Sequence, residues 1–129
     1  MMSEDKLSQL FNLLQKDRKL SHFSKDLTLA TRLKEIKDEV EELEVEVKAN
    51  NDEKIIDELG DVLWETFSLM ILAEDEGRGT SKQIIQSAID KLSRRKPFIL
   101  ENKVMETKEE ELNLYQKAKQ LEKINHSKN

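Results

Sequence analysis

The chain has 129 residues, of which 38% are charged and 36% hydrophobic, with three Gly, one Pro and no Cys. This composition is typical of long, solvated helices and the length suits one domain, so we expect a single all-α domain over residues 1–129. The absence of Cys excludes disulfides and thiolate metal sites, no segment approaches the roughly 18 apolar residues of a membrane span, and the net charge of −5 argues against stable binding to nucleic acid.

These exclusions favour a soluble protein in a reduced compartment. Residues 1–6 also lack the basic and then hydrophobic pattern of a leader segment, so we expect a cytoplasmic protein. Because the apolar content would give a lone chain only a modest core, we further expect helix faces to be buried against other copies in a homo-oligomer.

The first predicted helix runs from about Ser3 to Lys19 and carries an apolar stripe at helical spacing. Residues 20–25 have no clear period and are expected to form a connector. Asp26 or Thr28 then offers an N-cap for the second helix, because short polar side chains can accept a hydrogen bond from the first free backbone N–H groups.

The second predicted helix has the clearest pattern, because its apolar residues recur every three or four positions and define one core-facing stripe. A ridge of glutamates runs beside that stripe, displaced by about a quarter to a third of a turn. The ridge therefore flanks the core. The stripe consists of Leu29, Leu33, Ile36, Val40, Leu43 and Val47, and the ridge of Glu35, Glu39, Glu42 and Glu46.

Residues 49–52 form a predicted turn and cap, and a third helix follows with an apolar stripe that reaches Met70. Glu58, Asp61 and Glu65 form a ridge beside this stripe, with an offset like that of the preceding helix. Antiparallel packing of the two helices through the short loop would bring both acidic ridges together along one seam.

Two further helices are predicted after a break that contains glycine. One begins after a pattern at Thr80 and Gln83 that resembles a capping box, and it ends near Pro97. The last covers residues 107–125 and is opened by a similar pattern.

Two acidic pairs stand out within the ridges, Glu39 with Glu42 and Glu58 with Asp61. A spacing of three places both members on one side of a helix, and four such carboxylates are the hard oxygen ligands that Mg²⁺ requires. The alternative is an acidic face that is simply solvated. Gly60 favours a site, because glycine weakens a helix by roughly 1 kcal/mol and suggests close backbone approach or room for a ligand.

A second candidate motif lies in the fourth helix, where Lys91 and Arg95 are four residues apart and share one face. Arg95 could form a forked pair with a phosphate while Lys91 supplies a point charge. The alternative is that these cations only complement the negative end of the helix dipole.

Three motifs occur together in this order: E-x-x-E at residues 39–42, E-L-G-D at residues 58–61 and K-x-x-R-R-x-P at residues 91–97. In this combination the chain resembles the MazG-like nucleotide pyrophosphohydrolases of the all-α NTP pyrophosphatase superfamily. The resemblance covers about residues 21–97. It implies a four- to five-helix bundle that forms a homodimer, or a homotetramer built from two dimers.

The resemblance also implies a reaction, the Mg²⁺-dependent hydrolysis of a (deoxy)nucleoside triphosphate to the monophosphate and pyrophosphate, with Mn²⁺ as a substitute metal. One ligand carboxylate, or Glu35, would orient or deprotonate the attacking water. The implied metal ligands and catalytic residues are Glu39, Glu42, Glu58 and Asp61, and the implied phosphate-binding residues are Lys91 and Arg95.

Two alternatives stay open. The first is a dedicated dUTP, dCTP or phosphoribosyl-ATP pyrophosphatase on the same fold, and the second is a non-catalytic helical module whose acidic ridge binds a basic partner. Members of the family often carry Pro-Trp before the first acidic helix, where this chain has His22 and Phe23. Phe23 would either stack on a base or pack in the core, so the preferred base is left open, as is the choice between house-cleaning and control of nucleotide pools.

Overall fold

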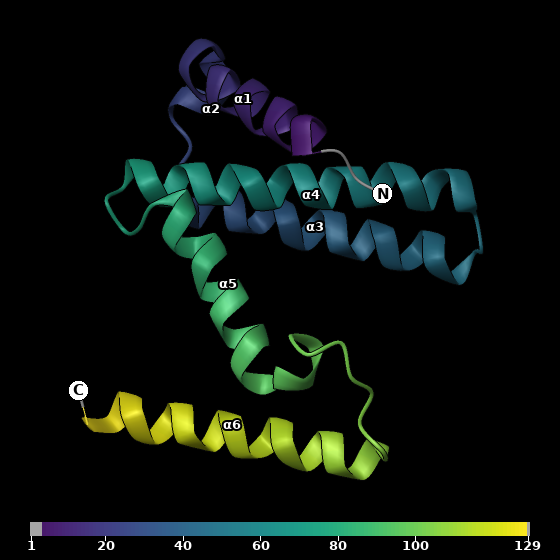
Figure 1. Ribbon diagram of the computed structural model, residues 1–129. Coiled ribbons are helices and arrows are strands. Elements are labelled where there is room, and N and C mark those ends of the chain that lie inside the picture. Colours follow the sequence, from purple (N-terminus) through teal and green to yellow (C-terminus); the bar gives the residue numbers. More distant parts are fainter. Residues whose placement is uncertain (1–3, 129) are drawn as a thin grey trace. The chain divides into compact units, whose positions relative to one another are not determined.

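Helices make up all the regular structure of the computed structural model, which describes the backbone of residues 4–128 and the side chains of residues 6–125 (Figure 1). This confirms the all-α prediction; the predicted start at Ser3 lies outside the described residues. The helices are α1 (Glu4–Leu20), α2 (His22–Lys25), α3 (Leu29–Lys48), α4 (Asp52–Asp75), α5 (Ser81–Arg95), the short 3₁₀ helix η1 (Pro97–Ile99) and α6 (Lys108–Lys128).

The helices fall into two compact units, a first unit up to Ser81 and a second unit from Lys82 onward. The expectation that the chain forms a single domain stays a prediction. Among the described residues, no helix is both long enough and apolar enough to cross a membrane.

Side-chain caps set most of the helix starts. Thr28 caps α3 in a reciprocal pair, in which its hydroxyl accepts from the Thr31 backbone N–H and the Thr31 hydroxyl accepts from that of Thr28. Asn51 caps α4 and Thr107 accepts from the Glu110 backbone N–H at the start of α6, as expected of small polar residues at these positions.

The prediction that residues 20–25 form a connector is wrong for Leu20, which ends α1, and for residues 22–25, which form the single turn of α2. Ser21 caps this turn by accepting from the Ser24 backbone N–H at 3.3 Å, and the Ser24 hydroxyl donates to Asp17 at 2.5 Å. A helix of four residues is too short to show an apolar period, so the pattern alone could not reveal it.

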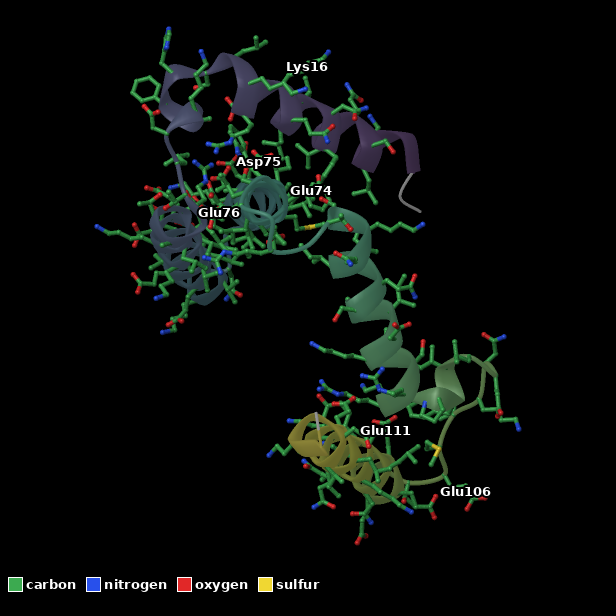
Figure 2. The ribbon with its side chains drawn as sticks, turned by 90° about the vertical axis from the view of Figure 1, so that its left-hand side faces the viewer. Lys16, Glu74, Asp75, Glu76, Glu106 and Glu111 are labelled. Atoms are coloured by element: carbon green, nitrogen blue, oxygen red, sulfur yellow. The ribbon has the colours of Figure 1, made fainter. Side chains whose placement is uncertain are left out.

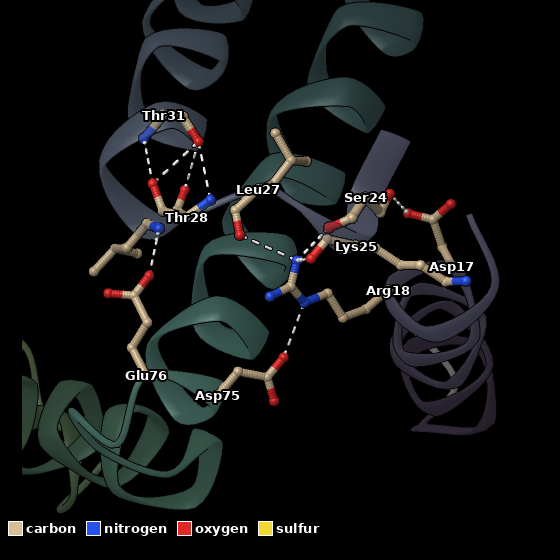
Figure 3. A network of polar contacts seen from close by, with 10 residues as sticks. Asp17, Arg18, Ser24, Lys25, Leu27, Thr28, Thr31, Asp75 and Glu76 are labelled. Atoms are coloured by element: carbon tan, nitrogen blue, oxygen red, sulfur yellow. Dashed lines mark hydrogen bonds and ion pairs between the residues drawn. The ribbon is translucent and has the colours of Figure 1, made fainter. Parts of the chain in front are cut away.

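The side chain of Arg18 connects the end of α1 to the segment between α1 and α3 and to the end of α4 (Figure 3). Its Nη1 donates to the backbone carbonyls of Ser24, Lys25 at 2.9 Å and Leu27 at 3.1 Å, and its Nε donates to Asp75 at 3.0 Å. One guanidinium therefore supplies donors to carbonyls of the short helix and its connector, where the regular helical hydrogen bonding ends.

Three successive carboxylates, those of Glu74, Asp75 and Glu76, lie at the C-terminal end of α4 (Figure 2). Acids are unfavourable at this end of a helix dipole, but each has a partner here. Asp75 belongs to the network above, Glu76 accepts from the Leu29 backbone N–H at 2.6 Å, and Glu74 accepts from that of Ser81 at 3.2 Å. The backbone of Leu29 is also the main reason why the pKa of Glu76 is lowered. These acids thus connect the end of α4 to the starts of α3 and α5.

The antiparallel hairpin of α3 and α4 is the largest packing unit of the first unit, and α1 lies across α4 (Figure 1). Asn50 makes the tight connection in the left-handed backbone region, with φ of 54°, which asparagine tolerates better than most residues. Phe11 of α1 meets Phe67 of α4 edge to face at 5.7 Å. The buried hydrophobic side chains gather around this crossing: Leu14, Met70, Ile71 and Leu72.

The stripe predicted to be the core face of α3 is not buried within the chain. None of the residues of α3 is buried, because α4 is the helix that covers it and one neighbour shields only part of a helical face. Leu33, Val40 and Val47 are exposed, while Leu29, Ile36 and Leu43 are half-buried.

Candidate functional site

Three of the predicted carboxylates come together where α3 and α4 lie side by side. Glu39 comes from α3, Glu58 and Asp61 come from successive turns of α4, and one oxygen of each lies within 4.8 Å of the others. The antiparallel pairing produces this acidic cluster, because it apposes the two ridges that flank the apolar stripes. All three residues are half-buried.

Two oxygens of the acidic cluster lack any partner. Oε2 of Glu39 and Oε2 of Glu58 are shielded from solvent and have no hydrogen bond. A buried carboxylate oxygen without a donor is costly, and a cation would supply the missing interaction. Three converging carboxylates form a donor set of hard oxygens, which fits a divalent ion such as Mg²⁺.

The pKa values of Glu39 and Glu58 in the acidic cluster also favour the binding of a cation. Burial, followed by the negative charge of Glu42, raises the pKa of Glu39 to about 7. Burial and the charge of Glu42 also raise the pKa of Glu58. A bound cation reverses this effect, because it stabilises the ionised carboxylates that burial and mutual repulsion disfavour.

Glu42 has a different position from the other three predicted ligands. It is exposed and is not part of the three-residue cluster, although its charge acts on both Glu39 and Glu58. The four-carboxylate ligand set therefore stays a prediction.

An ion pair that the sequence pattern did not reveal lies beside the acidic cluster. Arg32 of α3 binds Glu65 of α4 in a fork, with Nε to Oε2 at 2.6 Å and Nη2 to Oε1 at 3.0 Å. Glu65 is buried, and burial is the largest cause of its raised pKa, while the charge and the hydrogen bonds of Arg32 act in the opposite direction. A signal for this pair exists, because Arg32 stands three residues before Glu35 and so begins the same ridge.

The two predicted phosphate-binding residues, Lys91 and Arg95, line one groove of about 570 Å³ in the second unit. Lys91 is exposed, whereas Arg95 is held by Glu122 of α6, with Nη2 to Oε2 at 2.9 Å. The acidic cluster belongs to the first unit and these cations to the second. Their action on a common substrate is a proposal. The groove is also lined by Lys96, Lys108, Glu111, Leu112 and Tyr115.

Phe23, one of the residues considered for base recognition, is 91% exposed on α2. Phe23 therefore does not pack in the core of the chain, which was one of the two roles considered for it. Trp64 of α4 is also exposed, and exposed Trp side chains are enriched at protein interfaces.

Comparisons with known proteins agree with the three motifs. The MazG nucleotide pyrophosphohydrolase domain family matches residues 27–100, more than half of the chain. A crystal structure of a MazG-related protein from Thermotoga maritima aligns with a TM-score of 0.82 and 20% identity, over 88% of this chain and 98% of that one. At this identity the likeness shows the fold. Curated proteins give no match. The predicted family resemblance is thereby confirmed.

The raised pKa of Glu39 predicts how the stability of the metal-free protein depends on pH. Its pKa is about 7 in the folded chain against 4.5 as the ordinary value, so the folded state holds the proton more tightly. This contribution to stability is complete below pH 4.5 and is lost as the pH rises through 7. In EDTA, the melting temperature of the Glu39→Gln variant should therefore increase relative to that of the natural chain as the pH rises from 5 to 8.

The control for this measurement is Glu41→Gln, which removes an exposed carboxylate of the same helix outside the acidic cluster. If the difference in melting temperature between the Glu39 variant and the natural chain is constant from pH 5 to 8, the raised pKa of Glu39 is contradicted.

Gly60 yields a second prediction, because it lies in the helix between Glu58 and Asp61 and a Cβ placed there meets nothing within 4 Å. The expected close backbone approach is therefore not found in the described residues. Gly60→Ala should raise the free energy of unfolding by about 1 kcal/mol, as measured by chemical denaturation.

Gly77→Ala is the matched control with the opposite sign. Gly77 has a φ of +72°, where a side chain is strained, so this change should destabilise the chain. Destabilisation by the Gly60 variant would instead indicate that the space beside Gly60 is filled in the assembled protein.

Proposed function

The chain belongs to the MazG nucleotide pyrophosphohydrolase family, and we propose that it hydrolyses a (deoxy)nucleoside triphosphate to the monophosphate and pyrophosphate with Mg²⁺, or with Mn²⁺ in its place. We place this activity in a cytoplasmic homo-oligomer. The observation that supports it best is the acidic cluster, in which three carboxylates from two helices converge and two oxygens lack a partner.

The acidic cluster would hold the metal through Glu39, Glu58 and Asp61, with Glu42 as the nearby fourth carboxylate. When bound, a divalent cation supplies polarisation of phosphate oxygens and a lowered pKa of bound water. The carboxylates would hold that cation between the packed helices α3 and α4. A cluster carboxylate or the exposed Glu35 would accept the proton of the attacking water.

The cations of α5 would serve the other end of the substrate. Lys91 is exposed in the groove and offers a compact positive charge, whereas the guanidinium of Arg95 has the geometry to bind two phosphate oxygens at once. Charge accumulates on the leaving pyrophosphate during the reaction, and these two cations would stabilise it.

The proposal of a homo-oligomer is supported by exposed apolar side chains on the helices of the first unit. Ile56 is 72% exposed, and Val40, Leu59 and Trp64 are exposed on the same pair of helices. Large exposed apolar patches on a soluble protein normally mark interaction sites. We propose that a second copy covers it and completes the helical bundle.

The experiment that tests the activity is a panel of ribo- and deoxynucleoside triphosphates with and without Mg²⁺, scored for pyrophosphate and monophosphate. We expect release of both products from at least one nucleotide only when the metal is present. Glu58→Gln should lower the rate about 100-fold or more, because loss of a metal ligand removes several kcal/mol of transition-state stabilisation.

Glu53→Gln is the matched control, since it removes an exposed carboxylate of α4 outside the acidic cluster and should retain activity. If no nucleotide is hydrolysed, the proposal that the chain is a nucleotide pyrophosphohydrolase is wrong. Full activity of the Glu58 variant would remove the acidic cluster from the mechanism.

Light scattering tests the assembly. We expect the mass of a dimer or tetramer, and we expect Ile56→Glu to shift it toward the monomer, because the change places a charge in the proposed interface. A natural chain that is monomeric at micromolar concentration would be the contrary result.

A further inference from the structure

A single carboxylate of α6 binds both arginines at the end of α5. Oε1 of Glu122 accepts from Nη2 of Arg94 at 3.1 Å and from its Nε at 3.3 Å, while Oε2 accepts from Nη2 of Arg95 at 2.9 Å. The Tyr115 hydroxyl lies 3.4 Å from Nη1 of Arg95, whose charge also faces the Tyr115 ring at 5.5 Å. These groups all lie within the second unit.

Long side chains make this connection, and the helix backbones stay apart. Among the described residues, no Cα atom of α6 lies within 8 Å of a Cα atom of α5. Leu112, Leu121 and Ile124 of α6 are each more than half exposed, so tight apolar packing does not hold α6 in place. The ion pairs with Glu122 can therefore be exchanged without disrupting a packed core.

Arg95 has two neighbouring environments. It lines the groove beside Lys91, and it also binds Glu122, which is not among the residues that line the groove. Its Nε is shielded from solvent and has no partner, so Glu122 and Tyr115 leave part of its fork unused. The groove carries Lys91, Arg95, Lys96 and Lys108 against the single acid Glu111 and so favours an anion.

A carboxylate and a phosphate are equivalent partners for an arginine fork, because both present two oxygens in the plane of the guanidinium. Glu122 thus occupies Nη2 of Arg95 together with Nε and Nη2 of Arg94, donors that a phosphate group would use. The pair is charged on both sides, because hydrogen bonding to Glu122 raises the pKa of Arg95 and hydrogen bonding from Arg95 lowers the pKa of Glu122. A ligand that replaces Glu122 must therefore be an anion.

We propose that Glu122 is an internal competitor for phosphate: it binds Arg94 and Arg95 when the groove is empty, and the phosphates of a bound nucleotide displace it. The affinity of the chain for phosphate is then set by α6 as well as by the motif on α5. This inference rests on the proposed function, because it takes Arg95 to be a phosphate contact.

The test measures binding of inorganic tripolyphosphate by calorimetry in EDTA, so that neither metal binding nor catalysis contributes. Glu122→Gln keeps the shape of the side chain and removes its charge, and it should bind tripolyphosphate roughly two- to tenfold more tightly than the natural chain. Glu122→Asp keeps the charge but shortens the reach, and it should give a smaller gain.

Two controls separate this effect from general electrostatics and from misfolding. Glu109→Gln removes an exposed carboxylate from the first turn of α6 and should leave the affinity nearly unchanged. Circular dichroism of each variant verifies the helical content. If the Glu122→Gln chain loses helix, the Asp variant decides the question.

The outcomes separate the inference from the proposed function. Equal or weaker binding by both Glu122 variants overturns the competition, and weaker binding would show that Glu122 instead orients Arg95. Arg95→Ala should weaken binding. If it does so while the Glu122 variants show no gain, only the competition fails; if it has no effect, the phosphate role of Arg95 and the competition fail together. Nucleotide hydrolysis, measured separately, tests the activity itself.

Discussion

The antiparallel pairing of α3 and α4 is the constraint on which the candidate metal site depends. Glu39 stands on one helix and Glu58 and Asp61 on the other, so the cluster exists only while the helices hold one register. The Arg32–Glu65 fork secures that register beside the cluster. Separation of the helices at this point would leave the buried Glu65 without its cation, which is far more costly than the loss of a surface ion pair.

Local periodicity placed Glu39, Glu58 and Asp61 on ridges that the structure brings together, but it did not indicate the long-range polar contacts. Glu58 and Asp61 share a helical face because of their spacing, and the short loop before α4 leaves an antiparallel hairpin as the simple solution. The turn of α2 depends instead on Arg18, which reaches carbonyls up to nine residues away. The contact of Arg95 with Glu122 spans 27 residues, and no pattern along the chain indicates it.

The apolar stripes show a different limit of sequence reasoning. Periodicity correctly identified one apolar face on α3, but it does not say what covers that face. Val40 and Leu33 remain exposed within the chain, although they belong to the stripe predicted to form the core. An apolar face is stabilised when it is removed from water. A second copy of the chain can cover that face as well as a further helix of the same chain can.

Like charges lie close together at the acidic cluster and at Arg94 and Arg95, and the two groups differ in their counter-charges. Arg94 and Arg95 have Glu122 as an internal counter-charge, whereas the shielded oxygens of Glu39 and Glu58 have no donor among the described residues. A group of like charges that is neutralised by an internal counter-charge is not destabilised in the absence of a ligand. The internal counter-charge then competes with the ligand and lowers the affinity of the group for it. A group that is not neutralised has raised pKa values and gains most from a cation. This difference supports the two proposals, a resident metal at the acidic cluster and an exchangeable phosphate at the arginines.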